Sequence, residues 1–78
     1  MADILTVVGK NIKYYRAKMG ITQEKLAKRA GINRSYLASL ERGRRNTTLK
    51  TVEALAKALG VSTRELVSPA DVLPEDDA

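Results

Sequence analysis

Three short segments of the chain repeat one arrangement: an apolar residue, a helix-capping residue, and a second apolar residue four positions past the cap. The capping residues are Thr22, Asn33 and Ser62. A capping side chain accepts hydrogen bonds from the free N–H groups at a helix start, and the two apolar residues clamp the entering chain. Three such starts within 78 residues predict several helices along the chain. This feature predicts an all-α chain with tight turns.

Glycines and apolar spacing set the lengths of these helices. Glycines stand at the expected turns, where a residue without Cβ adopts positive φ: Gly20, Gly31, Gly43 and Gly60. Between them, apolar residues recur at steps of three and four, the spacing of one helix face. The sequence predicts five helices, over residues 4–19, 23–30, 34–42, 49–59 and 63–67. We expect residues 1–67 to form one compact five-helix bundle and residues 68–78 to form a flexible acidic tail.

The second and third predicted helices form the most informative pair. Only Gly31, Ile32 and Asn33 separate them, so the two helices must cross steeply. Ala27 lets the helices approach closely, and Leu37 is one of the apolar residues that fill the space beneath the turn. This is the geometry of a helix-turn-helix module.

The charge distribution favours a polyanionic partner. All 14 basic residues lie between Lys10 and Arg64, and only three acidic residues share that range, which leaves a net charge of +11 there. Such a surface attracts nucleic acid or an anionic membrane face. No apolar stretch is long enough for a spanning helix or a signal peptide, so we expect a cytoplasmic protein without membrane contact.

The residue types argue against an enzyme. The chain contains no Cys and no His, which removes disulfides, Cys-based zinc sites and the usual general base. Ser35 and Ser39 lack a catalytic partner, and no Gly-rich phosphate loop or metal-ligand spacing occurs. We therefore expect no catalytic residues, no metal and no cofactor.

Several segments, in order, resemble the phage-repressor-like, or Xre-type, helix-turn-helix transcriptional regulators. The segment TQEKLA at 22–27 is similar to the opening of the first motif helix, SYLASLERG at 35–43 to the recognition helix and its exit, and LAKALGV at 55–61 to the fourth helix. The resemblance covers residues 8–67 and implies the lambda-repressor-like DNA-binding fold, with the motif at helices two and three. The segment ERGRRNTTL at 41–49 is also similar to restriction-modification controller proteins.

The third predicted helix would read DNA bases. A helix of about nine residues fits the B-DNA major groove, about 12 Å wide, with its N-terminal residues facing the base edges. The candidates for base reading are Arg34, Ser35, Ala38 and Ser39. Arg34 is the main candidate, because its guanidinium can donate to both O6 and N7 of guanine. The alternatives are a phosphate contact or a bare surface charge for Arg34, and solvation for the two serines.

Phosphate contacts are expected from helix starts and flanking cations. The resemblance implies that Gln23 contacts a phosphate and braces Arg34; the alternative is a plain helix-start residue. Asn33 is a further candidate, with capping as its alternative, and Tyr36 is another, with packing on the domain as its alternative. The remaining backbone candidates form a charged cluster, whose alternative is a solubilising surface: Arg42, Arg44, Arg45, Asn46 and Lys50.

One arginine and one glutamate are assigned to structure. The resemblance implies a largely buried ion pair between Arg16 of the first helix and Glu41 at the end of the recognition helix. A bidentate pair of this kind would fix the angle between the recognition helix and the rest of the bundle.

The size of the module predicts a homodimer, because one such module reads only a few base pairs and specific binding uses two half-sites. The expected seam is Val61, Leu66 and Val67, with Val72 and Leu73 as additions. Core packing is the equal alternative for Val61 and Leu66, and a disordered tail is the favoured alternative for Val72 and Leu73.

These observations predict a sequence-specific, double-stranded-DNA-binding transcriptional regulator. We expect it to bind an inverted-repeat operator as a homodimer and to regulate its own promoter, as a controller protein or small repressor would. RNA polymerase is a further candidate partner. Whether binding represses or activates stays open. The alternative function is a protein-interaction module, such as an antitoxin or adaptor subunit.

Overall fold

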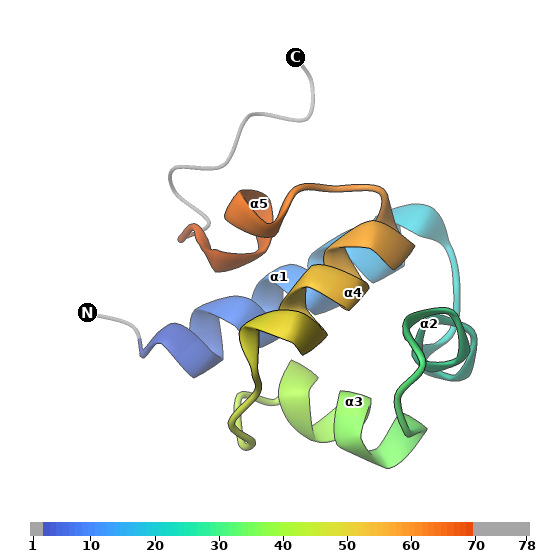
Figure 1. Cartoon of the computed structure of the whole chain (residues 1–78), viewed down its shortest axis with the longest axis horizontal. Coiled ribbons are helices and arrows are strands. Elements are labelled where there is room, and N and C mark those ends of the chain that lie inside the picture. The colour runs from blue at the N-terminus through green and yellow to red at the C-terminus, as the bar shows by residue number, and fades with distance from the viewer. Residues whose placement is uncertain (1–2, 70–78) are drawn as a thin grey trace.

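The computed structural model describes residues 3–69 and arranges them as five helices in a single bundle (Figure 1). The helices are α1 (Ile4–Met19), α2 (Gln23–Ala30), α3 (Arg34–Glu41), α4 (Leu49–Leu59) and α5 (Thr63–Val67), and no strand occurs within the described residues. The predicted all-α fold is confirmed. The third helix ends one residue earlier than predicted, because Arg42 forms its C-cap and the chain turns at Gly43, where φ is 71°.

The predicted caps begin α2, α3 and α5. Thr22 accepts a hydrogen bond from the backbone N–H of Lys25, and Ser62 forms a reciprocal capping box with Glu65. The start of α4 has the same chemistry without the apolar clamp, since the Thr48 hydroxyl accepts from the N–H of Thr51 at 3.1 Å. Capping therefore fixes where the short helices begin.

Gly31 makes the turn between α2 and α3. Its φ of 73° is left-handed, and the N–H of Ile32 donates back to the Ala27 carbonyl at 2.9 Å. This closure ends α2 and reverses the chain within three residues. As a result, α3 crosses below α2 at a steep angle, which is the predicted helix-turn-helix geometry (Figure 1).

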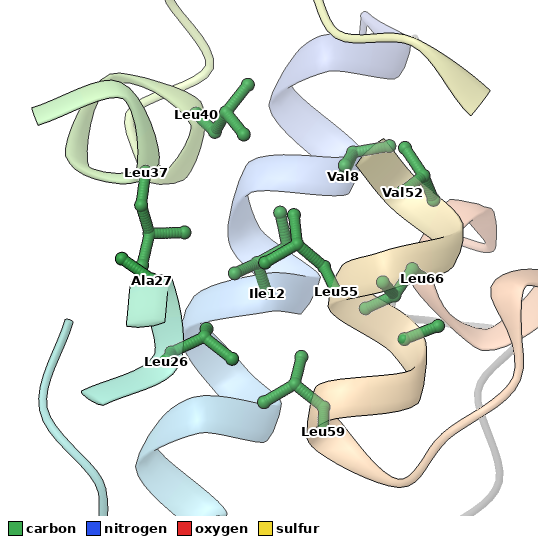
Figure 2. Packing of buried hydrophobic residues seen from close by; sticks show 11 residues of the cluster. Val8, Ile12, Leu26, Ala27, Leu37, Leu40, Val52, Leu55, Leu59 and Leu66 are labelled. Carbon is green, nitrogen blue, oxygen red and sulfur yellow. The ribbon is translucent and has the colours of Figure 1, made fainter. Parts of the chain in front are cut away.

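The core is aliphatic and is organised around α1. Side chains from every helix meet in it (Figure 2), and five of them have no solvent exposure: Ile12, Leu26, Leu37, Leu55 and Leu66. Ala27, also buried, lies where α2 meets α3. Leu37 and Leu40 enter this core from α3, so α3 is anchored through one face.

Gly9 allows α1 and α3 to touch through their backbones, a contact that the sequence analysis missed. A Cβ atom at this position would overlap the Leu40 carbonyl oxygen and would lie 2.9 Å from the Glu41 carbonyl oxygen. Glycine is therefore needed here for the close approach of two helices and not for an unusual φ.

Asn11 attaches α5 to α1. Its side chain is buried, 2% exposed, and its amide donates to the carbonyl oxygens of Leu66 at 2.9 Å, Ser68 at 2.7 Å and Glu65 at 3.3 Å. These carbonyls lie at the C-terminal end of a five-residue helix, where no further turn can satisfy them. Asn11 thus supplies the C-terminal cap that α5 lacks in its own sequence.

Replacing Asn11 by alanine is expected to lower the free energy of unfolding by about 2 kcal/mol, because buried carbonyls lose their donor. Urea unfolding followed by circular dichroism measures the effect. Lys13→Ala, an exposed change on the same helix, serves as the control and should stay within about 0.5 kcal/mol of the parent. Equal stability of the two variants would contradict the capping role of Asn11.

Candidate nucleic-acid interface

The N-terminal part of α3 projects from the bundle with its polar side chains outward. Arg34 and Ser35 are exposed and Ser39 is partly exposed, whereas Leu37 and Leu40 are buried on the opposite face. We call the surface formed by Arg34, Ser35 and Ser39 the α3 surface. It has the shape that sequence reasoning predicted: a polar stripe on a helix whose other face is anchored in the core.

Ala38 does not share this exposure, which corrects its predicted place in the outward stripe. Ala38 is only 8% exposed. Position 38 lies one turn beyond Arg34 and beside the buried Leu37, so the short methyl group stays within the helix packing. Arg34 escapes the same burial because it is the first residue of α3 and has a long side chain.

Gln23 links the start of α2 to both ends of α3. Its Nε2 donates to Glu41 Oε1 at 3.0 Å, and its Oε1 accepts from Arg34 Nη1 at 3.4 Å. The contact with Arg34 is the one that the family resemblance implied. The contact with Glu41 was not predicted, although both residues had been singled out separately, because no local sequence pattern pairs positions 18 residues apart.

The Asn33 side chain serves as the N-cap of α3. Its Oδ1 accepts from the backbone N–H groups of Ser35 at 2.7 Å and Tyr36 at 3.2 Å. Asn33 therefore caps the helix, which was the alternative to a phosphate contact. Capping occupies two of the free N–H groups at the start of α3, which reduces what the helix end itself can offer to a phosphate.

Tyr36 holds the loop after α3 against the helix. Its hydroxyl donates to the Asn46 carbonyl oxygen at 3.2 Å, and the Arg45 guanidinium lies 5.1 Å from the centre of its ring. Tyr36 therefore packs on the domain, which was the alternative to a phosphate contact.

The side chains predicted to contact the DNA backbone after α3 are all exposed. They comprise four cations and one amide: Arg42, Arg44, Arg45, Lys50 and Asn46.

The predicted pair between Arg16 and Glu41 lies behind α3. Arg16 Nε donates to Glu41 Oε2 at 2.6 Å and Nη2 donates to Oε1 at 3.1 Å, with side-chain exposures of 17% and 4%. Arg16 also donates to the Ile21 carbonyl oxygen at 3.0 Å. The hydrogen bond to Glu41 raises the pKa of Arg16, against the opposing effect of burial, and attraction to the Glu41 charge adds to the increase. The pair joins α1 to the end of α3.

The packing of α5 removes one residue from the predicted dimer seam. Leu66 has no solvent exposure and belongs to the core cluster, so its assignment to the seam is wrong and its core alternative is right. Because α5 packs against α1 and α4, its fully buried apolar side chain is not available to a partner. Val61 and Val67 stay partly exposed at the edge of the core. Val72 and Leu73 lie outside the described residues.

Two further features bear on the kind of site. Among residues 3–69, no helix is long and apolar enough to cross a membrane. Within the same range, no three acidic side chains come together in a way that would hold a metal ion.

A steeply crossed helix pair, with an exposed arginine at the start of its second helix and cations after it, defines a helix-turn-helix DNA-binding protein. Residues 12–66 match the HTH_3 helix-turn-helix family. The chain belongs to this family, whose members are DNA-binding transcriptional regulators and not enzymes, in agreement with the expectation from the sequence.

Curated relatives extend over most of the chain. An uncharacterized HTH-type transcriptional regulator, y4dJ of Sinorhizobium fredii, is 50% identical over 92% of this chain and 94% of its own length. The control protein C.SmaI of Serratia marcescens is 41% identical over 85% and 79%, respectively. The immunity repressor of Bacillus phage phi105 is 42% identical over 91% of this chain, which spans about half (49%) of the repressor.

Solved structures agree in fold. The hypothetical transcription factor NHTF from Neisseria is 36% identical, with a TM-score of 0.85 over 88% of this chain and 79% of its own. The restriction-modification controller protein C.AhdI from Aeromonas hydrophila is 40% identical, with a TM-score of 0.77 over 80% and 94%. The biofilm regulator SinR, solved in complex with DNA, is 35% identical, with a TM-score of 0.75 over 78% and 98%. The predicted membership of the Xre-type regulators is confirmed.

Proposed function

We propose that this regulator binds an inverted-repeat operator as a homodimer, places α3 in the major groove of each half-site and controls its own promoter. One observation carries the proposal: Arg34 stands exposed at the start of α3, supported by Gln23, and a run of exposed cations follows the other end of the same helix. The outward placement of charge and the inward anchoring of the same helix are what groove binding requires.

Arg34 reads a guanine in this proposal. Its planar guanidinium offers donors to both O6 and N7, a match that no other base pair presents in the major groove. Ser35 and Ser39, one helical turn apart on the same surface, donate to or accept from neighbouring bases. Ala38 lends at most the edge of its methyl group, because most of its surface is covered.

The backbone is held on both sides of α3. Gln23 lies at the start of α2 and keeps one amide hydrogen beyond the one given to Glu41, which suits a phosphate oxygen. On the other side the contacts come from Arg42, Arg44, Arg45, Asn46 and Lys50. Asn33 and Tyr36 contribute mainly by shaping the helix start and the loop. Such contacts set register without reading sequence.

The dimer seam uses Val61, in the turn before α5, and Val67, at the end of α5, both of which are partly exposed. This helix packs on α1 and α4, so a partner seated there leaves the α3 surface uncovered. Two copies then present two recognition helices to half-sites about one helical turn apart. The similarity to proteins named as control proteins and an immunity repressor supports promoter control, with RNA polymerase as the neighbouring partner at the operator.

Selection of binding sites from a random duplex pool at about 150 mM salt tests the proposal, since weak nonspecific binding is suppressed there. We expect an inverted repeat with half-sites about ten base pairs apart. Sedimentation of the complex should give two chains for each repeat. A pool without any enriched motif would contradict the proposal and favour the protein-interaction alternative.

Arg34→Ala is expected to relax discrimination at one base pair of each half-site by about 1 to 3 kcal/mol, because the bidentate contact is lost. Competition binding with single-base variants of the enriched duplex measures this effect. Arg44→Ala is the matched control, because it removes the same charge from a proposed phosphate contact. It should weaken binding to all duplexes alike and reduce the salt slope by about one. Equal behaviour of both variants would contradict base reading by Arg34.

A further inference from the structure

A groove lies between the C-terminal half of α1 and the turn that leads from α4 into α5. Its volume is about 350 Å³, and we call it the α1–α5 groove; its lining residues are Tyr15, Lys18, Met19, Leu59, Val61 and Glu65. Met19 is 42% exposed, and Tyr14, whose ring meets the Tyr15 ring edge-on at 4.9 Å, is 41% exposed. Tyrosine and methionine are enriched where proteins make contacts. The groove therefore offers apolar surface that the described helices do not cover.

The chain leaves α5 at the face of α1 that borders this groove. The Ser68 carbonyl oxygen accepts from Asn11 Nδ2 at 2.7 Å, which holds the chain beside α1 just before the described residues end. Asn11, Tyr15 and Lys18 are spaced four and three residues apart, so they lie on one face of the helix. The next segment of the chain therefore starts on the same side of α1 as the groove.

The distance from this starting point to the groove is short. Because α1 rises about 1.5 Å per residue, Tyr15 lies about 6 Å and Met19 about 12 Å beyond Asn11 along the helix axis. An extended chain gains about 3.3 Å per residue, so the five residues from Ser68 to Leu73 span up to about 17 Å. Leu73 can therefore reach either end of the α1–α5 groove without any change in the five helices.

Residues 71–77, with the sequence DVLPEDD, match the groove in chemistry. They contain one adjacent pair of aliphatic side chains, Val72 and Leu73, and four carboxylates without any basic side chain. Two aliphatic side chains gain free energy when they leave water for an apolar lining. A segment of this composition suits an apolar groove that is bordered by positive charge.

The border of the groove has that charge. Helix α1 carries four basic residues and no acidic residue between Ile4 and Met19. The one acidic side chain in the lining, Glu65, is engaged in the capping box of α5, where its carboxylate accepts from the Ser62 N–H at 2.8 Å and hydroxyl at 3.2 Å. The acidic segment and the basic helix are therefore complementary in charge as well as in apolar surface.

We propose that residues 71–77 of the same chain dock in the α1–α5 groove, with Val72 and Leu73 against its apolar lining and the carboxylates beside the cations of α1. Val61 lines this groove and also belongs to the proposed dimer seam, so a second copy must displace the segment to reach it. This competition rests on the proposed function. The segment thereby holds back dimerisation of its own chain.

The first experiment uses the full chain without DNA, at a concentration where sedimentation shows single chains. In ¹³C-labelled protein, nuclear Overhauser effects are expected between the Leu73 methyl groups and the Tyr15 ring or the Met19 methyl group. At a higher concentration, where dimers form, an isotope-filtered mixture of labelled and unlabelled chains should give no such contact between copies. Contacts found only between copies, or no contact at either concentration, would overturn the proposal.

The second experiment measures the dimer dissociation constant by sedimentation over a range of concentrations. Leu73→Ser is expected to lower it about tenfold, because a segment docked in about two thirds of the molecules leaves one third competent, and both copies must be open. Leu49→Ser is the matched control: it removes a leucine that is 81% exposed at the start of α4 and should leave the constant unchanged.

The opposite result has a clear meaning. A weaker dimer in Leu73→Ser would place the segment inside the interface between the two copies, and an unchanged dissociation constant would show that the segment does not compete with a second copy. Either result would overturn the proposed competition for Val61.

Failure of this proposal can be distinguished from failure of the proposed function. An enriched inverted repeat that binds two chains, together with no contact between Leu73 and the groove in single chains, would overturn the docking alone. A chain that stays single at every concentration and on DNA would overturn the homodimer and, with it, the competition for Val61. The Overhauser measurement on single chains decides the docking in either case.

Discussion

Gly9→Ala is expected to lower the free energy of unfolding by about 3 kcal/mol or more, although the change raises helix propensity by about 1 kcal/mol. The new Cβ would meet the carbonyl oxygens of Leu40 and Glu41, which are backbone atoms and cannot swing aside. Relief requires α1 and α3 to separate, which loosens the core around Ile12 and Leu37. Urea unfolding followed by circular dichroism gives the free energy, and a fall in the midpoint with an unchanged slope is the expected form.

Gly20→Ala provides the matched control for Gly9→Ala. Gly20 has a φ of 73° and has no heavy atom within 4 Å of a Cβ placed there. Its replacement costs only the left-handed conformation, about 1 to 2 kcal/mol. If Gly9→Ala were no more destabilised than Gly20→Ala, the close contact of α1 with α3 would be excluded.

Glu41→Gln is expected to cost about 3 kcal/mol, because Arg16 is left charged among side chains that cannot neutralise it. The value lies at the low end of the range for broken buried pairs, since Arg16 keeps 17% of its side chain exposed and still donates to the Ile21 carbonyl. At about 4 to 8 °C per kcal/mol, Tm should fall by about 12 to 24 °C. Thermal unfolding measures it directly.

Glu53→Gln makes the same change of charge on the exposed side of α4 and should stay within about 0.5 kcal/mol of the parent. Adding Arg16→Met to Glu41→Gln should recover part of the loss, because no unpaired charge is then left behind. Additive losses, or a Glu41→Gln variant as stable as Glu53→Gln, would show that the pair does not stabilise the fold.

The helices could be predicted closely because their ends are encoded locally. Thr22, Asn33 and Ser62 cap the helices that they were expected to cap, and Gly31 makes the expected turn. Each of these signals needs only a few neighbouring residues. The same locality made the α3 surface visible in the sequence, since outward and inward positions follow from helical spacing.

Contacts between distant segments could not be predicted in this way. Asn11 reads as an ordinary polar residue on α1, yet it holds carbonyls more than 50 positions away. Gly9 lies inside a helix, where glycine has no local purpose. The burial of Leu66 and Ala38 depends on how completely neighbouring helices cover them, and apolar periodicity alone does not separate core from seam. The Arg16–Glu41 pair was found only through the family resemblance.

The two faces of α3 have separate roles, and this bears on how such a protein could evolve. Leu37 and Leu40 hold the helix, whereas Ser35 and Ser39 take no part in the core. Under the proposed base-reading role of the α3 surface, substitutions at the two serines can therefore be sampled at little risk to folding, and lineages can move toward new operators one base at a time. Substitution of Arg34 is more restricted, because its side chain also donates a hydrogen bond to Gln23. In the proposed function, a change of the base that position 34 reads would require paired mutations at positions 23 and 34, and related proteins should differ at both positions together.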